Sequence, residues 1–282
     1  MIPSPLISVV TGSNKGIGLA IVKALCQDFD GVVYLTSRDT NLGEAAVKKL
    51  KGELPANQSK KLRYHQLDIL ESKSAIEFAK HLKNTHGGLD VLVNNAGISY
   101  VFRENITESL YEQAVATIAT NYYGTKESSK VIFPLLKKNA KVINVCSRSG
   151  NLSRQGVPVQ QRLTKDNLSE AELDAIAEDF KNAVKTGSHV AQGFSDSAYR
   201  VSKALEIALS FLQQRELLVH RPQDQILVAP CCPGFVSSDM NRFKGEISAE
   251  EGAETPAMLC FTPYNQENLF KFWFESDKHE WS

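Results

Sequence analysis

Short apolar runs rich in β-branched and aromatic residues recur along the chain and alternate with segments of helical periodicity. Amphipathic helical segments, such as 17–29, 42–51 and 74–84, fit between most of these runs. Strand–helix alternation predicts βαβ units, and therefore a parallel sheet that is covered by helices on both faces. The predicted strands are residues 6–10, 32–36, 62–67, 89–93, 142–145, 226–229 and about 269–274.

One long interval interrupts this alternation. About fifty residues separate strand 142–145 from the predicted helix that carries Tyr199, and the interval begins with a polar, irregular stretch at 150–167. Ser169 and Glu172 then have the spacing of a capping box, which predicts a helix over roughly 169–185. The apolar face of this helix would consist of Leu173, Ile176, Ala177 and Phe180.

These patterns predict an α/β fold with one doubly wound, Rossmann-type parallel sheet of about seven strands. A chain of 282 residues is long enough for one large domain. We expect a single domain over residues 1–282, with an inserted helical segment at about 150–190. In such sheets ligands bind beyond the carboxyl ends of the strands, so those strand ends are the candidate site.

Composition and charge argue against several classes of function. The 32 basic and 32 acidic residues balance and form no long run of one sign, so neither nucleic acid nor a membrane surface is an expected partner. No stretch approaches the ~18 apolar residues of a membrane helix, and the first residues lack the basic region of a signal peptide. The five cysteines lack zinc-site spacing, which predicts no metal and reduced thiols in a cytoplasmic protein.

A glycine-rich turn follows the first predicted strand and opens the first helix. Glycines permit a tight turn close to a pyrophosphate, and the helix N-terminus offers unpaired N–H groups to that anion. A merely structural turn is the alternative, but the position between the first strand and the first helix favours dinucleotide binding. The candidate residues are Gly12, Ser13, Asn14, Lys15, Gly16, Ile17 and Gly18.

The end of the second predicted strand indicates which dinucleotide binds. An acidic side chain there would accept hydrogen bonds from the adenosine ribose and select NAD. This chain has Ser37 and then Arg38, whose guanidinium suits a 2′-phosphate, and Lys15 adds a second cation. We therefore expect NADP(H). The alternative is that both cations are solvated at the surface, with Asp39 partly neutralising Arg38.

Two further strand ends carry candidate cofactor contacts. Asp68, followed by Ile69, could accept a hydrogen bond from the adenine amine. Asn95 could tie neighbouring strand ends together through its amide, while Ala96 and Gly97 leave room for a ribose. Structural and cofactor roles are compatible at these positions.

A tyrosine and a lysine supply the candidate chemistry. Tyr199 and Lys203 would lie one turn apart on the same face of a helix. A phenol with a pKa of about 10 is a poor acid at neutral pH, but a nearby ammonium favours the phenolate and lowers that pKa. Alone the pair is weak evidence, because a half-buried tyrosine beside a surface lysine is the commoner arrangement.

Other motifs join these in a fixed order that spans nearly the whole chain: Thr11-Gly12-x-x-x-Gly16-x-Gly18, Asn94-Asn95-Ala96-Gly97, Asn121, Ser147, Tyr199-x-x-x-Lys203 and Pro233-Gly234. Together they resemble the short-chain dehydrogenase/reductase family. The resemblance implies that Tyr199 protonates a carbonyl oxygen as hydride arrives. It also implies that Lys203 lowers the pKa of Tyr199 and binds the nicotinamide ribose.

The same resemblance implies roles for further residues. Ser147 would hydrogen-bond the substrate oxygen and help to hold developing negative charge, although Ser149 is an alternative two residues on. Asn121 would fix a water that relays protons to Lys203. At the end of the sixth predicted strand, the implied contacts to the nicotinamide are Pro233, Gly234, Val236 and Ser238.

One spacing narrows the resemblance. Ser147 precedes Tyr199 by 52 residues, whereas most family members place this serine much closer to the tyrosine. An insertion at this point is similar to that of the monomeric NADPH-dependent carbonyl reductases, and plant menthone- and salutaridine-type reductases share it. The resemblance implies reduction of small ketones, aldehydes and quinones. It also implies a monomer, because the inserted helix would cover the helices through which other members dimerise.

Two other functions stay open at this point. An NAD(P)-dependent dehydrogenase could oxidise a specific alcohol of steroid, prostaglandin or terpenoid type, although Arg38 argues against NAD. A dinucleotide-binding sensor with a dormant site is a second alternative, which the intact catalytic positions disfavour. Cys231 and Cys232 would lie beside the pocket; a small buried thiol is the expectation for Cys231, and both a buried and a reactive thiol stay open for Cys232.

Overall fold

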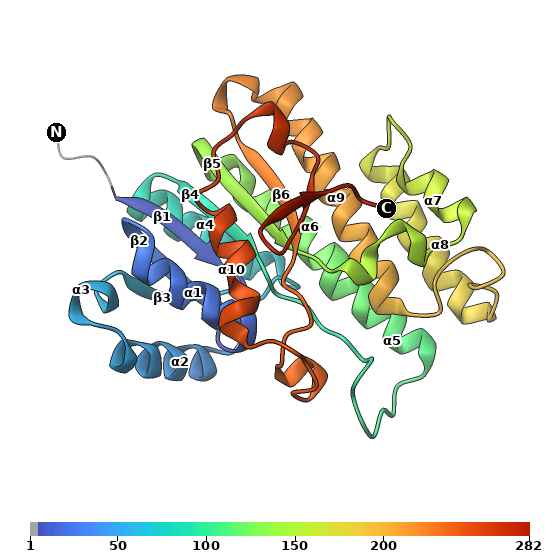
Figure 1. Cartoon of the computed structure of the whole chain (residues 1–282), viewed down its shortest axis with the longest axis horizontal. Coiled ribbons are helices and arrows are strands. Elements are labelled where there is room, and N and C mark those ends of the chain that lie inside the picture. Colours follow the sequence, from blue (N-terminus) through green and yellow to red (C-terminus); the bar gives the residue numbers. More distant parts are fainter. Residues whose placement is uncertain (1–4) are drawn as a thin grey trace.

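The computed structural model describes residues 5–282, and its strands form one sheet (Figure 1). The order across the sheet is β3-β2-β1-β4-β5-β6-β7-β8, and all neighbouring strands are parallel except the last pair. The strands are β1 (Leu6–Val10), β2 (Gly31–Ser37), β3 (Leu62–Gln66), β4 (Leu89–Asn94), β5 (Leu136–Val145), β6 (Leu227–Cys232), β7 (Phe272–Phe274) and β8 (Asp277–His279).

Helices connect the strands in the alternation that the sequence predicts. Within residues 5–282, no helix combines the length and the apolar character that crossing a membrane requires. The α-helices are α1 (Gly16–Asp28), α2 (Thr40–Glu53), α3 (Ala56–Ser59), α4 (Ser72–His86), α5 (Leu110–Thr117), α6 (Thr125–Ile132), α7 (Val157–Leu163), α8 (Glu170–Thr186), α9 (Ala198–His220) and α10 (Ala249–Leu259).

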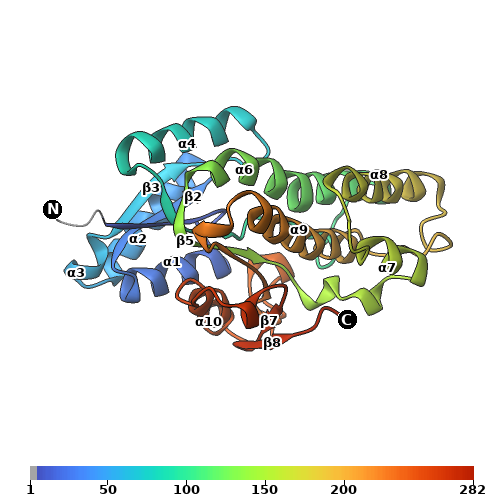
Figure 2. The same ribbon diagram turned by 90° about the horizontal axis from the view of Figure 1, so that it is seen from above.

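The helices cover both faces of the sheet, with α1, α2 and α10 on one side and α4, α6 and α9 on the other (Figure 2). Successive side chains of a strand point to opposite faces, and β1 shows this directly. Val9 packs in the core cluster that contains Phe78 of α4, whereas Val10 packs in the cluster that contains Leu25 of α1. The predicted doubly wound, Rossmann-type sheet is therefore confirmed.

The predicted count of about seven strands is one too low. The additional strand, β8, pairs antiparallel with β7 and has the sequence Asp-Lys-His, all exposed. A strand without an apolar face leaves no periodic signal in the sequence. Strand β5 also begins earlier than predicted. Its first half is polar and includes Asn139 at a φ of 63°, so the sequence there lacks the apolar pattern from which a strand is predicted.

The inserted segment forms α7 and α8, which lie beside α5 and α9 (Figure 1). The predicted capping box is present, since Ser169 Oγ accepts from the Glu172 amide and the Glu172 carboxylate accepts from the Ser169 amide. The predicted apolar face of α8, which includes Leu173 and Phe180, packs in one buried cluster with Val201 of α9 and Ala114 of α5. The insertion therefore covers the outer faces of α5 and α9.

A buried charge pair fixes α8 to the helix that follows α5. The Lys126 side chain is 4% exposed, and its Nζ lies 2.7 Å and 2.8 Å from the two carboxylate oxygens of Asp174 on α8. The Tyr122 hydroxyl donates to the same carboxylate at 2.8 Å, and burial together with this contact raises the pKa of Tyr122 far above its usual value. Glu127 and Glu170 complete the surroundings of the ammonium.

Replacing Asp174 with Asn should therefore destabilise the protein. We expect Asp174→Asn to lower the free energy of unfolding by about 2 kcal/mol, less than for a fully isolated pair because Glu127 and Glu170 still face Lys126. Asp179→Asn is the matched control on the same helix, where an exposed pair with Arg162 is worth less than about 1 kcal/mol. Urea unfolding of both variants measures the difference, and equal effects would contradict this account of how the insertion is held.

Candidate active site

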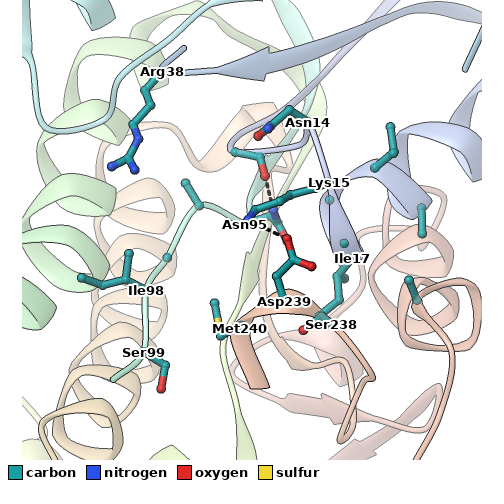
Figure 3. Close-up of a pocket in the computed structure, with 18 of the residues that line it drawn as sticks. Asn14, Lys15, Ile17, Arg38, Asn95, Ile98, Ser99, Ser238, Asp239 and Met240 are labelled. Carbon is teal, nitrogen blue, oxygen red and sulfur yellow. Dashed lines mark hydrogen bonds and ion pairs between the residues drawn. The ribbon is translucent and has the colours of Figure 1, made fainter. Parts of the chain in front are cut away.

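A cleft of about 720 Å³ opens at the carboxyl ends of β1 to β4 (Figure 3). Its walls come from the turn after β1, the ends of the neighbouring strands and the segment after β6. Of the residues predicted to bind a cofactor, those that line the cleft are Gly12, Asn14, Lys15, Gly16, Ile17, Gly18, Arg38, Asp68, Ile69, Asn95, Ala96, Gly97 and Ser238.

The turn after β1 requires its glycines. Gly12 and Gly16 have φ values of +58° and +56°, a region that side chains disfavour. A Cβ on Gly12 would lie 2.8 Å from Ala96, and a Cβ on Gly18 would lie 2.4 Å from Asn95 Nδ2. A Cβ on Gly16 would meet only Ser238, at 3.9 Å, so this part of the turn faces open space in the cleft.

Ser13 differs from the other residues of the turn because it faces inward. Its hydroxyl donates to the Val10 carbonyl oxygen at 2.7 Å, and its amide donates to the Thr36 carbonyl oxygen at 2.8 Å. Both polar groups are therefore used within the protein, and the side chain is fully buried. The structure assigns Ser13 to joining β1 and β2 rather than to the cleft.

Asn95 ties the ends of β1 and β4 together, as the sequence predicts. Its Nδ2 donates to the carbonyl oxygens of Thr11 and Gly12 at 2.9 Å and 3.0 Å. Thr11 Oγ1 in return accepts from the amides of Asn95 and Ala96 at 2.9 Å and 3.0 Å. These bonds hold the floor of the cleft in one geometry.

Arg38 and Lys15, which the sequence predicts to bind a 2′-phosphate together, both line the cleft but lie apart from each other. Arg38 lies at one end, whereas Lys15 Nζ lies 2.8 Å from Asp239 Oδ2 on the opposite wall (Figure 3). Both members of this ion pair are more than half exposed, so it is a weak contact that a ligand can replace. Asp239 itself follows no recognisable motif, and sequence reasoning missed it. Arg38 is the cation that this geometry leaves beside the end of β2.

The helical turn that carries Asn121 connects the cleft to the candidate chemistry. Asn121 lies in a π-helical segment, η1 (Ile118–Gly124), of the kind often found at functional sites. Its amide bonds both backbone groups of Ile98 and donates to Ser202 Oγ at 2.9 Å. A Cβ on Gly97 would lie 3.2 Å from Asn121 Oδ1 and 3.8 Å from Lys203 Nζ, so Lys203 approaches the floor of the cleft.

Tyr199 and Ser147 meet beside this floor. Tyr199 lies in the first turn of α9, which Ser197 caps, and the Ser147 hydroxyl just beyond β5 is close enough to lower the pKa of the tyrosine. Ser147 also accepts the Ser149 amide at 3.1 Å, which holds its hydroxyl in place. Ser147, rather than Ser149, is thus the serine that contacts the tyrosine.

Lys203 is buried and held on two sides. Its side chain is 6% exposed, and Nζ donates to the Val145 carbonyl oxygen at 3.0 Å. Nζ also lies 2.7 Å from Glu206 Oε2, and the Glu206 side chain is 3% exposed. Burial by itself lowers the pKa of Lys203, but the Glu206 carboxylate together with Tyr199 and Cys146 outweighs burial, and the pKa lies above its usual value. Glu206 matches no motif, and sequence reasoning missed it.

The pKa of Tyr199 corrects one expectation from the sequence. Lys203 does lower this pKa, as predicted, but burial raises it by more, and Glu206 raises it further. The net direction is upward from the ordinary value, so Tyr199 is protonated at neutral pH in this structure. A tyrosine in this state is equipped to donate a proton.

The segment after β6 forms a lid that reaches across to the loop after β4. Gly234 begins it with a φ of +88°, and Val236 pairs with Ile247 in an isolated bridge. The ring of Phe235 packs 6.0 Å from that of Phe102 on the opposite loop. Ser238 lines the cleft, whereas Pro233, Gly234 and Val236 form the lid's base rather than the cleft wall in this structure.

A second cavity of about 270 Å³ lies on another side of Tyr199. The inserted segment supplies Phe180, Val184 and His189 to its wall, and the loop after β4 supplies Tyr100. His189 Nδ1 is buried there and makes no hydrogen bond among the described residues. The insertion therefore shapes the space next to the candidate acid.

Comparisons with known proteins agree with this arrangement. Residues 7–159 match the family model described as short chain dehydrogenase. Carbonyl reductase (NADPH) 1 of Sus scrofa is 40% identical over 263 residues, which cover 93% of this chain and 89% of that protein. The chain belongs to the short-chain dehydrogenase family.

Two solved structures of this family show the same architecture. Salutaridine reductase from Papaver somniferum is 28% identical, with a TM-score of 0.84 over 96% of this chain and 99% of that one. Menthone neomenthol reductase from Mentha piperita is 26% identical, with a TM-score of 0.81 over 98% of this chain and 100% of that one.

Cys231 and Cys232, at the end of β6, are both buried. Cys231 is inaccessible, and burial raises the pKa of its thiol well above the ordinary value, which disfavours the reactive thiolate. Cys232 is 4% exposed, and its sulfur accepts from the Gly234 amide at 3.4 Å. Both thiols act as small apolar side chains here.

Proposed function

We propose that this chain is an NADPH-dependent carbonyl reductase that converts ketones, aldehydes and quinones to alcohols and hydroquinones, with Tyr199 as general acid. The observation that carries the proposal is that Tyr199, Ser147 and the buried Lys203 come together at the floor of the cleft, with Lys203 Nζ 5.8 Å from the centre of the Tyr199 ring. The relatives named carbonyl reductase (NADPH) support the cofactor and the reaction.

The cleft suits a dinucleotide. Gly16 leaves open space where a side chain would intrude, and the N-terminus of α1 points its amides at that space. Arg38 would pair with a 2′-phosphate, Asp68 and Ile69 would contact the adenine, and Asn95 to Gly97 would contact a ribose. Lys203, Gly234 and Val236 would hold the nicotinamide end. Bound there, the cofactor supplies the hydride.

The chain's own residues control the proton. The Tyr199 hydroxyl would donate its proton to the carbonyl oxygen, so that no free alkoxide forms. Ser147 would donate a hydrogen bond to the same oxygen, stabilising charge as it develops. Because its pKa lies above the ordinary value, Tyr199 carries the proton that this donation requires, whereas oxidation of an alcohol would need the phenolate. Asn121 would hold the water through which Lys203 and Tyr199 regain a proton.

The substrate is proposed to be a small carbonyl compound with both apolar and polar parts. The cavity beside Tyr199 is lined by apolar side chains, such as Phe180 and Val184, and by polar ones, such as Gln113 and His189, so apolar burial and hydrogen bonds would both contribute to binding. This lining belongs to the insertion and to the loop after β4, the parts of the chain that differ most from a plain Rossmann-type sheet.

We further propose a monomeric, cytoplasmic protein. The insertion covers the outer faces of α5 and α9 with the apolar side of α8 and the buried Lys126–Asp174 pair. All five cysteines are free and buried, which fits a reducing compartment. In dilute solution, sedimentation should give the mass of one chain; a stable dimer would mean that another surface mediates assembly.

Tyr199→Phe tests the general acid. We expect kcat for NADPH consumption with phenanthrenequinone to fall by at least about 100-fold, because the variant lacks the transferable proton. Tyr264→Phe removes the same atom outside the site and should leave the rate unchanged. An active Tyr199→Phe protein would overturn the assignment, and an inactive wild-type protein that still binds NADPH would point to a narrow dehydrogenase or a sensor.

Arg38→Ala tests the choice of cofactor. We expect kcat/KM for NADPH to fall by about tenfold to a hundredfold, because a hydrogen bond to a charged group is worth about 1.5–3 kcal/mol. The value for NADH, which has no 2′-phosphate, should stay the same and serves as the internal control. Equal losses with both cofactors would show that Arg38 does not read the phosphate.

A further inference from the structure

Glu206 is a buried carboxylate that faces the lysine of the candidate site. It follows Lys203 by three residues on α9, so both side chains lie on one face of the helix. Their charged atoms, Lys203 Nζ and Glu206 Oε2, are 2.7 Å apart, and the side chains are 6% and 3% exposed. Oε2 has no other hydrogen-bond partner among the described residues.

This arrangement is not explained by stability. The Glu206 residue is only 2% exposed, so its carboxylate has lost its contact with bulk water. Burying an ion pair costs desolvation energy that the attraction repays poorly, and apolar replacements of such pairs are often neutral or stabilising. Lys203 would be held by the Val145 carbonyl oxygen without Glu206.

We propose that Glu206 is a positioning residue for the reaction, whose carboxylate offsets the charge of Lys203 and so keeps the Tyr199 hydroxyl protonated into the alkaline range. The inference rests on the proposed function, because it assigns the protonation of its general acid. Lys203 alone would favour the phenolate, and the opposite charge of Glu206 offsets part of that effect at Tyr199.

The groups around Tyr199 agree with this role. From α9, Lys203 lowers its pKa and Glu206 raises it; from β6, Cys232 raises it, and Ser147 lowers it by hydrogen bonding. The Cys146 thiol, just after β5, faces Lys203 and Glu206, and burial raises its pKa well above the ordinary value, so it is neutral near pH 7.

Glu206 itself titrates in the working range. Burial raises its pKa to about 7, although Lys203 opposes the shift. The carboxylate is therefore ionised in alkaline solution, where it matters for Tyr199, and becomes neutral below that range. A neutral variant should thus resemble the wild-type protein in acid and differ from it in alkali.

The test is the pH dependence of Glu206→Gln. At saturating NADPH, kcat/KM for a ketone should fall on the alkaline side, where Tyr199 loses its proton. In Glu206→Gln the midpoint of this fall should lie about one pH unit lower than in wild type, since removing a nearby charge shifts a pKa by one unit or more. The acid-side inflection of alcohol oxidation with NADP should move down by the same amount, because both report the ionisation of Tyr199. The two proteins' profiles should converge below pH 6, roughly one unit under the Glu206 titration.

A second measurement does not require turnover. The tyrosinate absorbance of each protein, minus that of its Tyr199→Phe counterpart, isolates the ionisation of Tyr199 in the free chain. The inflection should lie at lower pH with Glu206→Gln than with Glu206. If wild type shows no NADPH-dependent reduction, the proposed function fails, and this titration still decides the role of Glu206.

Matched variants separate charge from packing. Glu206→Asp keeps the charge and should retain the wild-type inflection, whereas Glu206→Leu fills the space without charge and should follow Glu206→Gln. Glu216→Gln makes the same change at an exposed position of α9 and should alter nothing. Unshifted inflections in Glu206→Gln, or an equal shift in Glu206→Asp, would overturn the inference.

Discussion

The buried ammonium of Lys203 is the interaction on which the site depends. It joins α9 to the last residue of β5 through the Val145 carbonyl oxygen, and it approaches Gly97 at the end of β4. The same helix carries Tyr199 one turn earlier and Glu206 one turn later. One buried cation therefore ties the helix that carries the candidate acid to the strand ends beside the cleft, and its partner Glu206 adds to the effect of burial on the pKa of Tyr199.

The sheet and the insertion contribute different residues to the site. Parallel strands bring the glycine turn, Arg38 and Asn95 to one edge, where hydrogen bonds between strand ends make the cleft rigid. The insertion adds no strand. It packs α8 against α5 and α9 and contributes Phe180, Val184 and His189 to the cavity beside Tyr199, while the loop after β4 lines both this cavity and the cleft.

Much of this arrangement is predictable from the sequence, because local patterns determine it. Apolar periodicity gives the strands and helices, the Ser169–Glu172 spacing gives the start of α8, and the glycine turn and the Tyr199–Lys203 spacing give the cleft and the acid. The features that the sequence does not predict depend on tertiary contacts and burial. The inward turn of Ser13, the Lys15–Asp239 pair and the charged strand β8 leave no periodic signal, and the upward pKa of Tyr199 follows from burial and from Glu206.

The most direct test of the central claim follows the transferred atoms. A simple aromatic ketone should be incubated with the protein and NADPH that carries deuterium at the position that donates hydride, and the alcohol analysed by mass spectrometry and NMR. The account predicts one deuterium on the carbinol carbon, with the hydroxyl proton drawn from solvent through Tyr199. Alcohol without deuterium on that carbon, or no alcohol with cofactor bound, would contradict it.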